Sequence, residues 1–231
     1  MERRAILLPR QAGLTRKVVT ARFAAAPPPG RRAAPGNEAA LAAAPFLPAG
    51  ARGDHDLNPD LLPEPPLRPA GVLVPLIERP DGLTVLLTRR TDHLHHHAGQ
   101  ISFPGGRVDP GDESPLGAAL REAEEEIGLR RERVEPIGQL DLYVTRTGFE
   151  VTPVVGFVDP PDAFAPDPFE VAEIFEVPLD FVLDPANHQR HSRMFAGRPR
   201  SFYVLPWRDY YIWGATAGML VNLAEVLRPA P

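Results

Sequence analysis

The pattern of apolar and polar positions predicts a mixed sheet that begins near Ala70. Residues 71–77 form a continuous apolar run typical of a buried strand, Asp81-Gly82 favours a hairpin turn, and residues 83–90 return as the partner strand. Further strand patterns follow at residues 136–144, 150–157, 173–177 and 202–205. The sheet is therefore expected to combine strands from both halves of the chain.

Three stretches have the pattern of helices. The first covers residues 115–127, a short one begins near Pro178-Leu179, and the most apolar one covers residues 212–227. Asn222 and Glu225 interrupt the last stretch, whose longest apolar run is shorter than the roughly 20 residues that cross a bilayer, so we expect a buried closing helix and no transmembrane segment. The elements together predict an α/β protein of the α+β type, with one central and one C-terminal helix on a mixed sheet.

The central helix has the clearest local signals in the chain. Ser114 followed by Pro115 is typical of an N-cap and a first helical position, and Gly128 is typical of a C-terminal stop. The sequence therefore predicts a helix from about residue 115 to residue 127. Apolar residues recur in it at the three-to-four spacing of a core-facing stripe, at Leu116, Ala119, Leu120, Ala123 and Ile127.

Four glutamates lie close together near the end of this helix. At 3.6 residues per turn, Glu122, Glu125 and Glu126 project from one face, whereas Glu124 points away. Like charges at this spacing repel each other, and a hard divalent cation such as Mg²⁺ or Mn²⁺ would relieve the repulsion. Because Arg121 lies one turn before Glu125, we expect it to hold that carboxylate and to leave Glu122 and Glu126 as metal ligands.

A solvated acidic surface is the alternative interpretation of this helix. The glycines that precede it favour the metal site, because a loop of this kind brings backbone groups close to a phosphate and its metal. These glycines are Gly105, Gly106 and Gly111.

Composition narrows the class of protein. The 231 residues, 43% of them hydrophobic, are enough for one well-filled core. A net charge of −5 argues against a general nucleic-acid binder. The absence of cysteine excludes disulfides, thiolate zinc sites and a cysteine nucleophile, and it fits a cytoplasmic protein.

The first 69 residues differ in composition from the rest. Residues 1–36 are rich in arginine, alanine and proline, which is compatible with a transit peptide, a basic arm or a disordered tail. We expect a dispensable disordered tail, because a Pro/Ala tract buries little apolar surface. Asn37 can cap a short helix that runs to about Leu47, and the proline-rich residues 48–69 are expected to lie as a strap across a domain formed by residues 70–231.

The central stretch resembles the signature of the Nudix hydrolases. Glu113, seven intervening residues and the run from Arg121 to Leu129 (REAEEEIGL) match that pattern position by position. Six residues, rather than the usual five, separate Gly106 from Glu113, so either Arg107 occupies the glycine position of the signature or the loop carries one extra residue. The resemblance implies a Nudix-like α/β/α sandwich and metal-dependent hydrolysis of a diphosphate bond.

A second motif lies directly before the signature. The run LLTRRT at residues 86–91 and, three residues later, HHHAGQISFPGG at residues 95–106 are similar to the extra motif of the coenzyme A pyrophosphatase branch. His95 stands where that branch more often has arginine. The similarity implies hydrolysis of coenzyme A or acyl-CoA to 4′-phosphopantetheine, or its acyl form, and adenosine 3′,5′-bisphosphate. A homodimer is also expected from the family.

The resemblance assigns roles to individual residues. Glu122 and Glu126, helped by Glu125, would bind Mg²⁺ or Mn²⁺, with Arg121 in support. The general base would be a carboxylate on the helix or on a later loop, here Glu125 or Glu173, with Glu170 on the same later segment. The substrate-binding residues implied by the extra motif are Arg89, Arg90, His97, Gln100, Phe103, Gly105 and Gly106.

Three points stay open at the level of sequence. Arg89 and Arg90 alternate across a strand, so only one of them is expected to face the ligand. The spacing of His93, His95, His96 and His97 matches no standard zinc motif, so we expect no zinc site there. The substrate can also be another nucleoside diphosphate compound, and a catalytically silent Nudix domain is a further alternative, against which the intact glutamates count.

Overall fold

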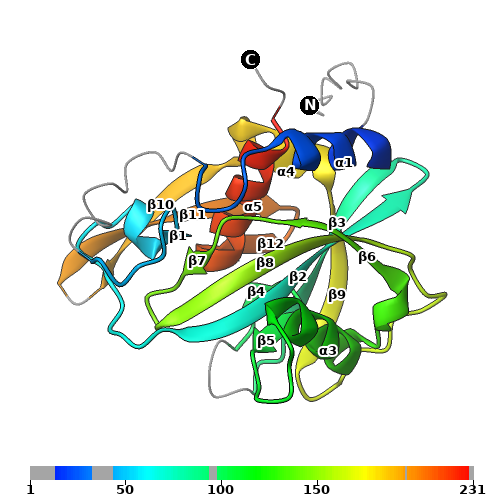
Figure 1. The fold of residues 1–231 in the computed structure, drawn as a ribbon, viewed down its shortest axis with the longest axis horizontal. Coiled ribbons are helices and arrows are strands. Elements are labelled where there is room, and N and C mark those ends of the chain that lie inside the picture. The colour runs from blue at the N-terminus through cyan, green and yellow to red at the C-terminus, as the bar shows by residue number, and fades with distance from the viewer. Residues whose placement is uncertain (1–13, 33–43, 94–97, 196, 229–231) are drawn as a thin grey trace, which may run out of the picture.

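A computed structural model describes residues 14–32, 44–93, 98–195 and 197–228 (Figure 1). Its helices are α1 (Arg16–Ala25), α3 (Pro115–Ile127), α4 (Leu179–Leu183) and α5 (Gly214–Val226), with short 3₁₀ turns η1 (Asp54–Asp56), η2 (Arg131–Arg133) and η3 (Pro185–Asn187). Its strands are β1 (Arg52–Gly53), β2 (Arg68–Arg79), β3 (Gly82–Arg90), β4 (Ile101–Ser102), β5 (Gly105–Arg107), β6 (Val134–Gln139), β7 (Tyr143–Val144), β8 (Phe149–Val158), β9 (Val171–Pro178), β10 (Gln189–Phe195), β11 (Arg198–Trp207) and β12 (Tyr210–Trp213).

The main sheet is mixed and, within the described residues, contains nine strands. Strand β2 is at its centre, because it pairs in parallel with β8 along residues 68–77 and antiparallel with β3 through the hairpin. On the edge of β2 that pairs with β3, the earlier residues Ala70, Gly71 and Val72 pair with β5. Gly71 lies opposite Gly106 there. The loop that precedes α3 is thereby fixed to the middle of the sheet.

Helices cover both faces of this sheet (Figure 1). On one face α3 places Ala119, Ala123 and Ile127 against Leu73 and Leu86 of the central strands. On the other face α4 and α5 pack on a larger apolar cluster. The α/β/α arrangement predicted from the sequence is therefore confirmed.

Helix α3 approaches β2 unusually closely. A Cβ atom at Gly71 would lie 1.9 Å from the carbonyl oxygen of Pro115, so only glycine allows this contact. The predicted bounds of the helix are confirmed at both ends. The predicted stripe is partly wrong, because Leu116 and Leu120 are only half-buried, whereas Glu126 is buried.

The predicted strands are confirmed with longer bounds, except that residues 136–144 divide into β6 and β7. The closing helix α5 begins two residues later than predicted, because Tyr210–Trp213 forms strand β12. Strands β10, β11 and β12 form a second, three-stranded antiparallel sheet, of which the sequence predicts only residues 202–205. Every side chain of β10 is exposed, so this strand lacks the alternating pattern that identifies a half-buried strand.

The prediction of a disordered tail is wrong for residues 14–32. Helix α1 buries Val19 and Phe23, and the guanidinium of Arg22 donates to the carbonyl oxygen of Leu227. The backbone N–H of Gly30 donates to buried Asp141 at 3.1 Å. We therefore infer that the domain includes this segment, which the sequence missed because the helix carries only a narrow apolar stripe.

The remaining N-terminal prediction is tested only in part. The helix expected from Asn37 to about Leu47 lies mostly outside the described residues, and residues 44–47 form a turn. Ala44, Leu47 and Ala51 pack with Val144 in a small apolar cluster. In the parts of the chain that the structure describes, no helix is long and apolar enough to cross a membrane.

The substitution Phe23→Ala is expected to lower the free energy of unfolding by about 3 kcal/mol, because it removes a large buried side chain that packs on Gly138. Chemical denaturation of the full chain measures this change. Val18→Ala, at a neighbouring position that is 37% exposed, is the matched control and should have little effect. Equal stabilities of the Phe23→Ala variant and the wild-type protein would show that α1 does not belong to the cooperative domain.

Candidate active site

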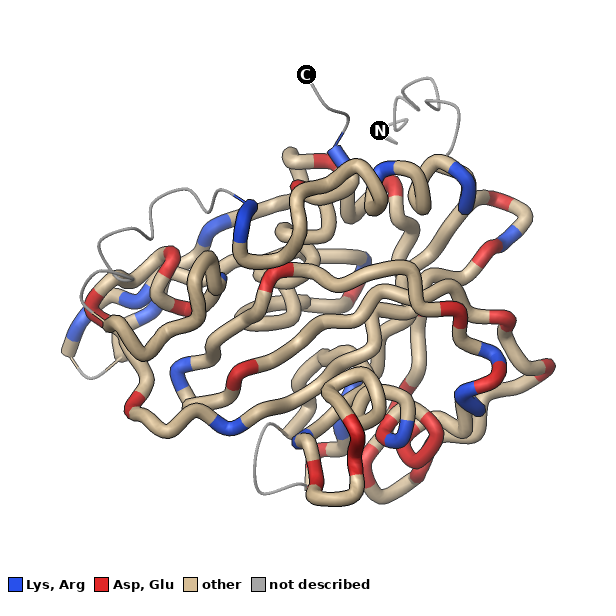
Figure 2. The backbone as a smooth tube through the Cα atoms, viewed as in Figure 1, with Lys and Arg blue, Asp and Glu red and all other residues tan. Residues whose placement is uncertain are grey.

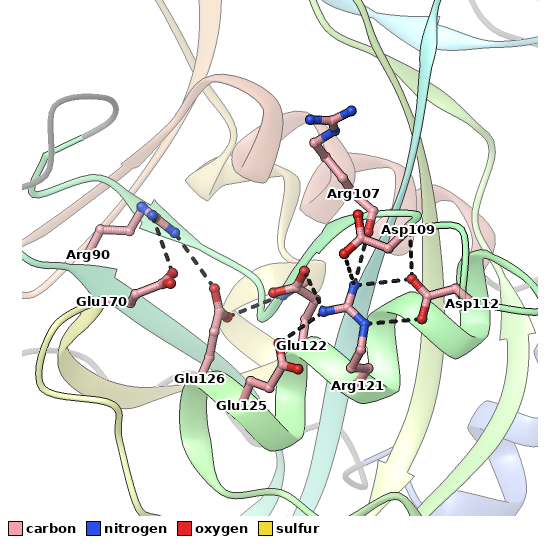
Figure 3. A network of polar contacts seen from close by, with 10 residues as sticks. Arg90, Arg107, Asp109, Asp112, Arg121, Glu122, Glu125, Glu126 and Glu170 are labelled. Carbon is pink, nitrogen blue, oxygen red and sulfur yellow. Dashed lines mark hydrogen bonds and ion pairs between the residues drawn. The ribbon is translucent and has the colours of Figure 1, made fainter.

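Figure 3 shows Glu122, Glu125 and Glu126 on α3, and the glycine pair of β5 lies against two of these carboxylates. The hydroxyl of Ser114 accepts the Gly117 N–H at 3.1 Å, and Gly128 ends the helix with a φ of +68°. These caps fix the helix in place, and the pairing of β5 with β2 brings Gly105 and Gly106 over its last turns. Backbone groups and carboxylates therefore meet at one place.

Glu126 is the most buried carboxylate of the group, with a relative exposure of 4%. Its Oε2 accepts the Gly105 N–H at 3.3 Å, and Arg90 Nη1 lies 3.6 Å from its Oε1. Burial raises the pKa of Glu126 to about 8, and the neighbouring Glu122 adds to the rise, whereas the Gly105 N–H and Arg90 oppose it. The Gly105 N–H and Arg90 therefore do not fully offset the cost of burying the Glu126 carboxylate in its charged form.

Glu122 lies against the second glycine of the pair. A Cβ atom at Gly106 would be 2.3 Å from Glu122 Oε1, so this carboxylate occupies the space that a side chain would fill. Burial also raises the pKa of Glu122, against the opposing effect of Arg121. Gly106 is therefore the loop residue whose lack of a side chain makes room for Glu122.

Arg121 joins the loop to the helix. Its Nη1 donates to Glu125 at 2.9 Å, as predicted, and also to Glu122 at 3.0 Å. Its Nε and Nη2 donate to the two carboxylate oxygens of Asp112, both at 3.1 Å, and Nη2 also reaches the carbonyl oxygen of Arg107. The sequence analysis missed Asp112, although an acidic residue in the loop that leads to the helix is the signal that could have found it.

The structure separates the two arginines at the end of β3. Arg90 lies between Glu126 and Glu170, with its Nη2 3.6 Å from Glu170 Oε2. Arg89 points to the other face of the sheet, where its Nε is 3.2 Å from Glu173. The prediction that only one arginine faces the site is therefore consistent with this arrangement, and that arginine is Arg90.

The placement of Glu173 contradicts its expected position beside the glutamates of the helix. Besides Arg89, it accepts a hydrogen bond of 2.6 Å from the Tyr210 hydroxyl. Alternation along β9 places Glu173 on the same face as Phe175, which belongs to the cluster under α5. Glu170, at the start of that segment, takes the place in the site that was expected for Glu173.

The histidine-rich loop contributes one described residue. His95, His96 and His97 lie outside the described residues, so the substrate-binding role expected for His97 stays a prediction. His93 lies near the Thr91 hydroxyl and contacts the ring of Phe169.

The donor chemistry of the site suits a hard divalent ion. As the side chains lie, no three acidic or histidine residues in the described ranges converge on one point, because Arg90 and Arg121 hold the carboxylates of Glu126 and Glu122. Carboxylate oxygens are nonetheless the ligands that Mg²⁺ and Mn²⁺ prefer. The burial of Glu126 supplies the electrostatic reason for a cation to bind there.

A cavity of about 530 Å³ opens from the glycine pair toward the second sheet. Its floor includes Val72, Phe103 and Met219, and Phe103 is almost fully buried. Of the expected substrate-binding residues, Arg90, Gln100, Phe103, Gly105 and Gly106 line it. The sequence analysis missed four further arginines of its lining, namely Arg107, Arg146, Arg193 and Arg200.

Charge is distributed unevenly around the cavity. Figure 2 shows acidic residues on α3 and its preceding loop, and basic residues along the β10–β11 hairpin. Trp213 lines the cavity, whereas Trp207 packs on Phe181, with 4.7 Å between the ring centroids. The cavity thus runs from the glycine pair, behind which the glutamates of α3 lie, to a basic and aromatic end at the second sheet.

The comparisons with known proteins agree with this geometry. The NUDIX domain family model matches residues 67–197. Proteins named "Uncharacterized Nudix hydrolase NudL" from Yersinia pestis (strain Pestoides F) and Yersinia pseudotuberculosis serotype O:1b are each 41% identical over 158 residues, which is 68% of this chain and 79% of the relative. The chain therefore belongs to the Nudix family. It is a Nudix hydrolase that acts on a pyrophosphate-containing substrate, and enzymes of this family generally need divalent metal ions.

Solved structures with a similar fold include other Nudix proteins. The Ap4A hydrolase of C. elegans in a binary complex is 22% identical, covers 48% of this chain and 80% of its own, and has a TM-score of 0.42. The MutT protein of Methanosarcina mazei Go1 is 28% identical, covers 52% of this chain and 83% of its own, and has a TM-score of 0.40.

Metal affinity is expected to rise with pH because of Glu126. Without metal, the pKa of Glu126 is about 8 in the folded protein and near its ordinary value of 4.5 in the unfolded chain. Between these two pKa values the folded protein binds one proton more than the unfolded chain. The contribution of Glu126 to the free energy of unfolding therefore falls as pH rises toward 8. A divalent ion needs the charged form, so its affinity should rise by about tenfold per pH unit below that pKa.

Calorimetric titration with Mn²⁺ at pH 6, 7 and 8 measures this slope. Glu126→Gln should bind weakly and lose most of the pH dependence, whereas Glu124→Gln, at an exposed position on the same helix, should retain it. Equal wild-type affinities at pH 6 and pH 7 would contradict the assignment.

Gly106→Ala is expected to weaken metal binding without unfolding the protein. The new methyl group would displace the flexible end of Glu122 rather than backbone, so the fold tolerates it while the carboxylate moves. The metal affinity should fall roughly 10-fold or more, the scale found when groups that support metal ligands are changed. Gly111→Ala, where a Cβ atom meets nothing within 4 Å, is the control. An unchanged affinity in Gly106→Ala would argue against a ligand role for Glu122.

Proposed function

We propose that this Nudix hydrolase cleaves the pyrophosphate of coenzyme A or an acyl-CoA and releases 4′-phosphopantetheine, or its acyl form, and adenosine 3′,5′-bisphosphate. The similarity of residues 86–106 to the extra motif of the coenzyme A branch is the first support. The second is that Arg90 and several residues of the second half of this motif, from Gln100 to Gly106, line the cavity beside α3, which is where a diphosphate substrate would reach the glutamates.

The observation that carries the proposal is the extent of the cavity. Gly105 and Gly106 border it next to Glu126 and Glu122, and from there it continues to Trp213 on the second sheet. Its volume of about 530 Å³ is in the usual range of ligand pockets of about 300 to 1,000 Å³. A substrate that extends well beyond its diphosphate fits this shape better than a short one.

The metal ligands of the proposal are Glu122 and Glu126, with Glu125 in support. Bound Mg²⁺ or Mn²⁺ would neutralise the pyrophosphate oxygens and acidify the attacking water. Arg121 positions Glu122 and Glu125 by its hydrogen bonds, and ties both to the loop through Asp112.

Other residues of the chain would bind the substrate and accept a proton. Arg90, now paired with Glu126 and Glu170, can turn its donors to a pyrophosphate oxygen when a metal takes over those carboxylates. Glu125 and Glu170 are the two carboxylates placed to take the proton of the water, because each is held by an arginine at the edge of the site and remains accessible.

A substrate panel tests the proposal. With Mg²⁺ or Mn²⁺ present, coenzyme A and its acyl derivatives should be cleaved with a higher kcat/KM than NADH or ADP-ribose, and product analysis should find adenosine 3′,5′-bisphosphate. Glu126→Gln should lower this activity by more than the roughly 10- to 100-fold typical of outer-sphere changes at metal sites, whereas Glu124→Gln should retain it. A panel in which only other nucleoside diphosphate compounds are cleaved would exclude coenzyme A as the substrate.

A further inference from the structure

Two arginines at the far end of the cavity lie on aromatic rings. Arg146, in the turn between β7 and β8, places its guanidinium carbon 4.6 Å from the ring centroid of Phe195. Arg193 of β10 lies in the same way over Trp213, at 4.7 Å. A guanidinium held by its flat face keeps its N–H groups free at the edge, so both arginines are oriented while their donors stay available.

These arginines also have no carboxylate partner among the described residues. Neither Arg146 nor Arg193 forms an ion pair with a carboxylate in the described parts of the chain, whereas Arg198 and Arg200 of the same small sheet share Asp60 at 2.8 and 2.6 Å. The positive charge at the far end of the cavity is therefore not neutralised by a neighbouring carboxylate.

The acidic residue in the described cavity lining forms no ion pair with them. Asp54 is the one acidic residue among the described lining residues, and it accepts from the Tyr143 hydroxyl at 3.1 Å and from the backbone N–H of Arg146 at 2.8 Å. Arg200 adds a buried Nε that has no hydrogen-bond partner among the described residues. The pattern is that of an anion site, because Arg146, Arg193 and the Nε of Arg200 line one concave surface, and neither Arg146 nor Arg193 is paired with a carboxylate among the described residues.

We infer that this end of the cavity binds a second anionic group of the substrate, a phosphomonoester carried on the nucleoside. The inference rests on the proposed function, in which the diphosphate lies beside Glu122 and Glu126 at the other end. In coenzyme A this group is the 3′-phosphate of the adenosine. Arg146 and Arg193 donate to its oxygens from two different sheets, and the adenosine then lies along the cavity between the two ends.

Kinetics with coenzyme A and dephospho-coenzyme A, which lacks only the 3′-phosphate, test this assignment. The wild-type enzyme should prefer coenzyme A. Arg193→Ala and Arg146→Ala should each lower kcat/KM for coenzyme A by about tenfold, chiefly through KM, and should shrink the preference over dephospho-coenzyme A. Arg190→Ala is the matched control, because Arg190 is on the opposite face of β10 and donates to the Tyr203 hydroxyl. A preference that is the same in all four proteins would overturn the inference.

A binding experiment separates this inference from the proposed function. Calorimetry should show that adenosine 3′,5′-bisphosphate binds the wild-type protein more tightly than adenosine 5′-monophosphate, and that Arg193→Ala reduces the difference, with thermal unfolding as the check on folding. If this difference is present but coenzyme A is not cleaved, the proposed function fails and the anion site stands. If the two nucleotides bind equally, the anion site is refuted even when coenzyme A is hydrolysed.

Discussion

The contact between the glycine pair of β5 and the acidic face of α3 is the constraint on which the site depends. It requires two close approaches at once, since β5 must pair with β2 while α3 packs on the same strand at Gly71. Gly71 admits the helix backbone, and Gly106 admits the carboxylate of Glu122. The carboxylates of Glu122 and Glu126 are consequently positioned by contacts with the backbone of Gly106 and Gly105. The position of a paired strand varies less than the conformation of a long side chain.

This geometry has an electrostatic consequence. Glu126 is taken out of water, and the Gly105 N–H and Arg90 together do not offset that loss, because its pKa is still raised to about 8. Arg121 is shared among Asp112, Glu122 and Glu125, so it fixes their positions more than it neutralises them. When Glu126 is ionised, the site therefore holds more negative charge than its arginines balance, and a divalent cation complements that charged form.

The sequence predicts the parts of the molecule whose signals are local. Helix α3 is predicted to the residue because Ser114, Pro115 and Gly128 mark its ends. The position of Glu173 was predicted wrongly because its partner depends on the register between β9 and β3, which pairs Glu173 with Arg89 on the face of the sheet away from α3. Strand β10 and helix α1 were missed for a related reason, since an exposed edge strand and a helix with two buried residues carry too little apolar periodicity. The arginines of the cavity come from separate segments, so only the folded chain brings them together.

Segments outside the family match help to build the far wall of the cavity. Asn58, in the strap before β2, donates to the Ser201 carbonyl oxygen and accepts the Ser201 N–H, both at 2.9 Å, and Asp60 binds the arginines of β11. The strap thereby fixes the small sheet whose residues Phe202 and Trp213 close the cavity. The glutamates of α3 lie within the matched residues 67–197, whereas part of the far wall of the cavity is built by residues on either side of that range. A change in the strap therefore acts on the far wall of the cavity without touching a glutamate.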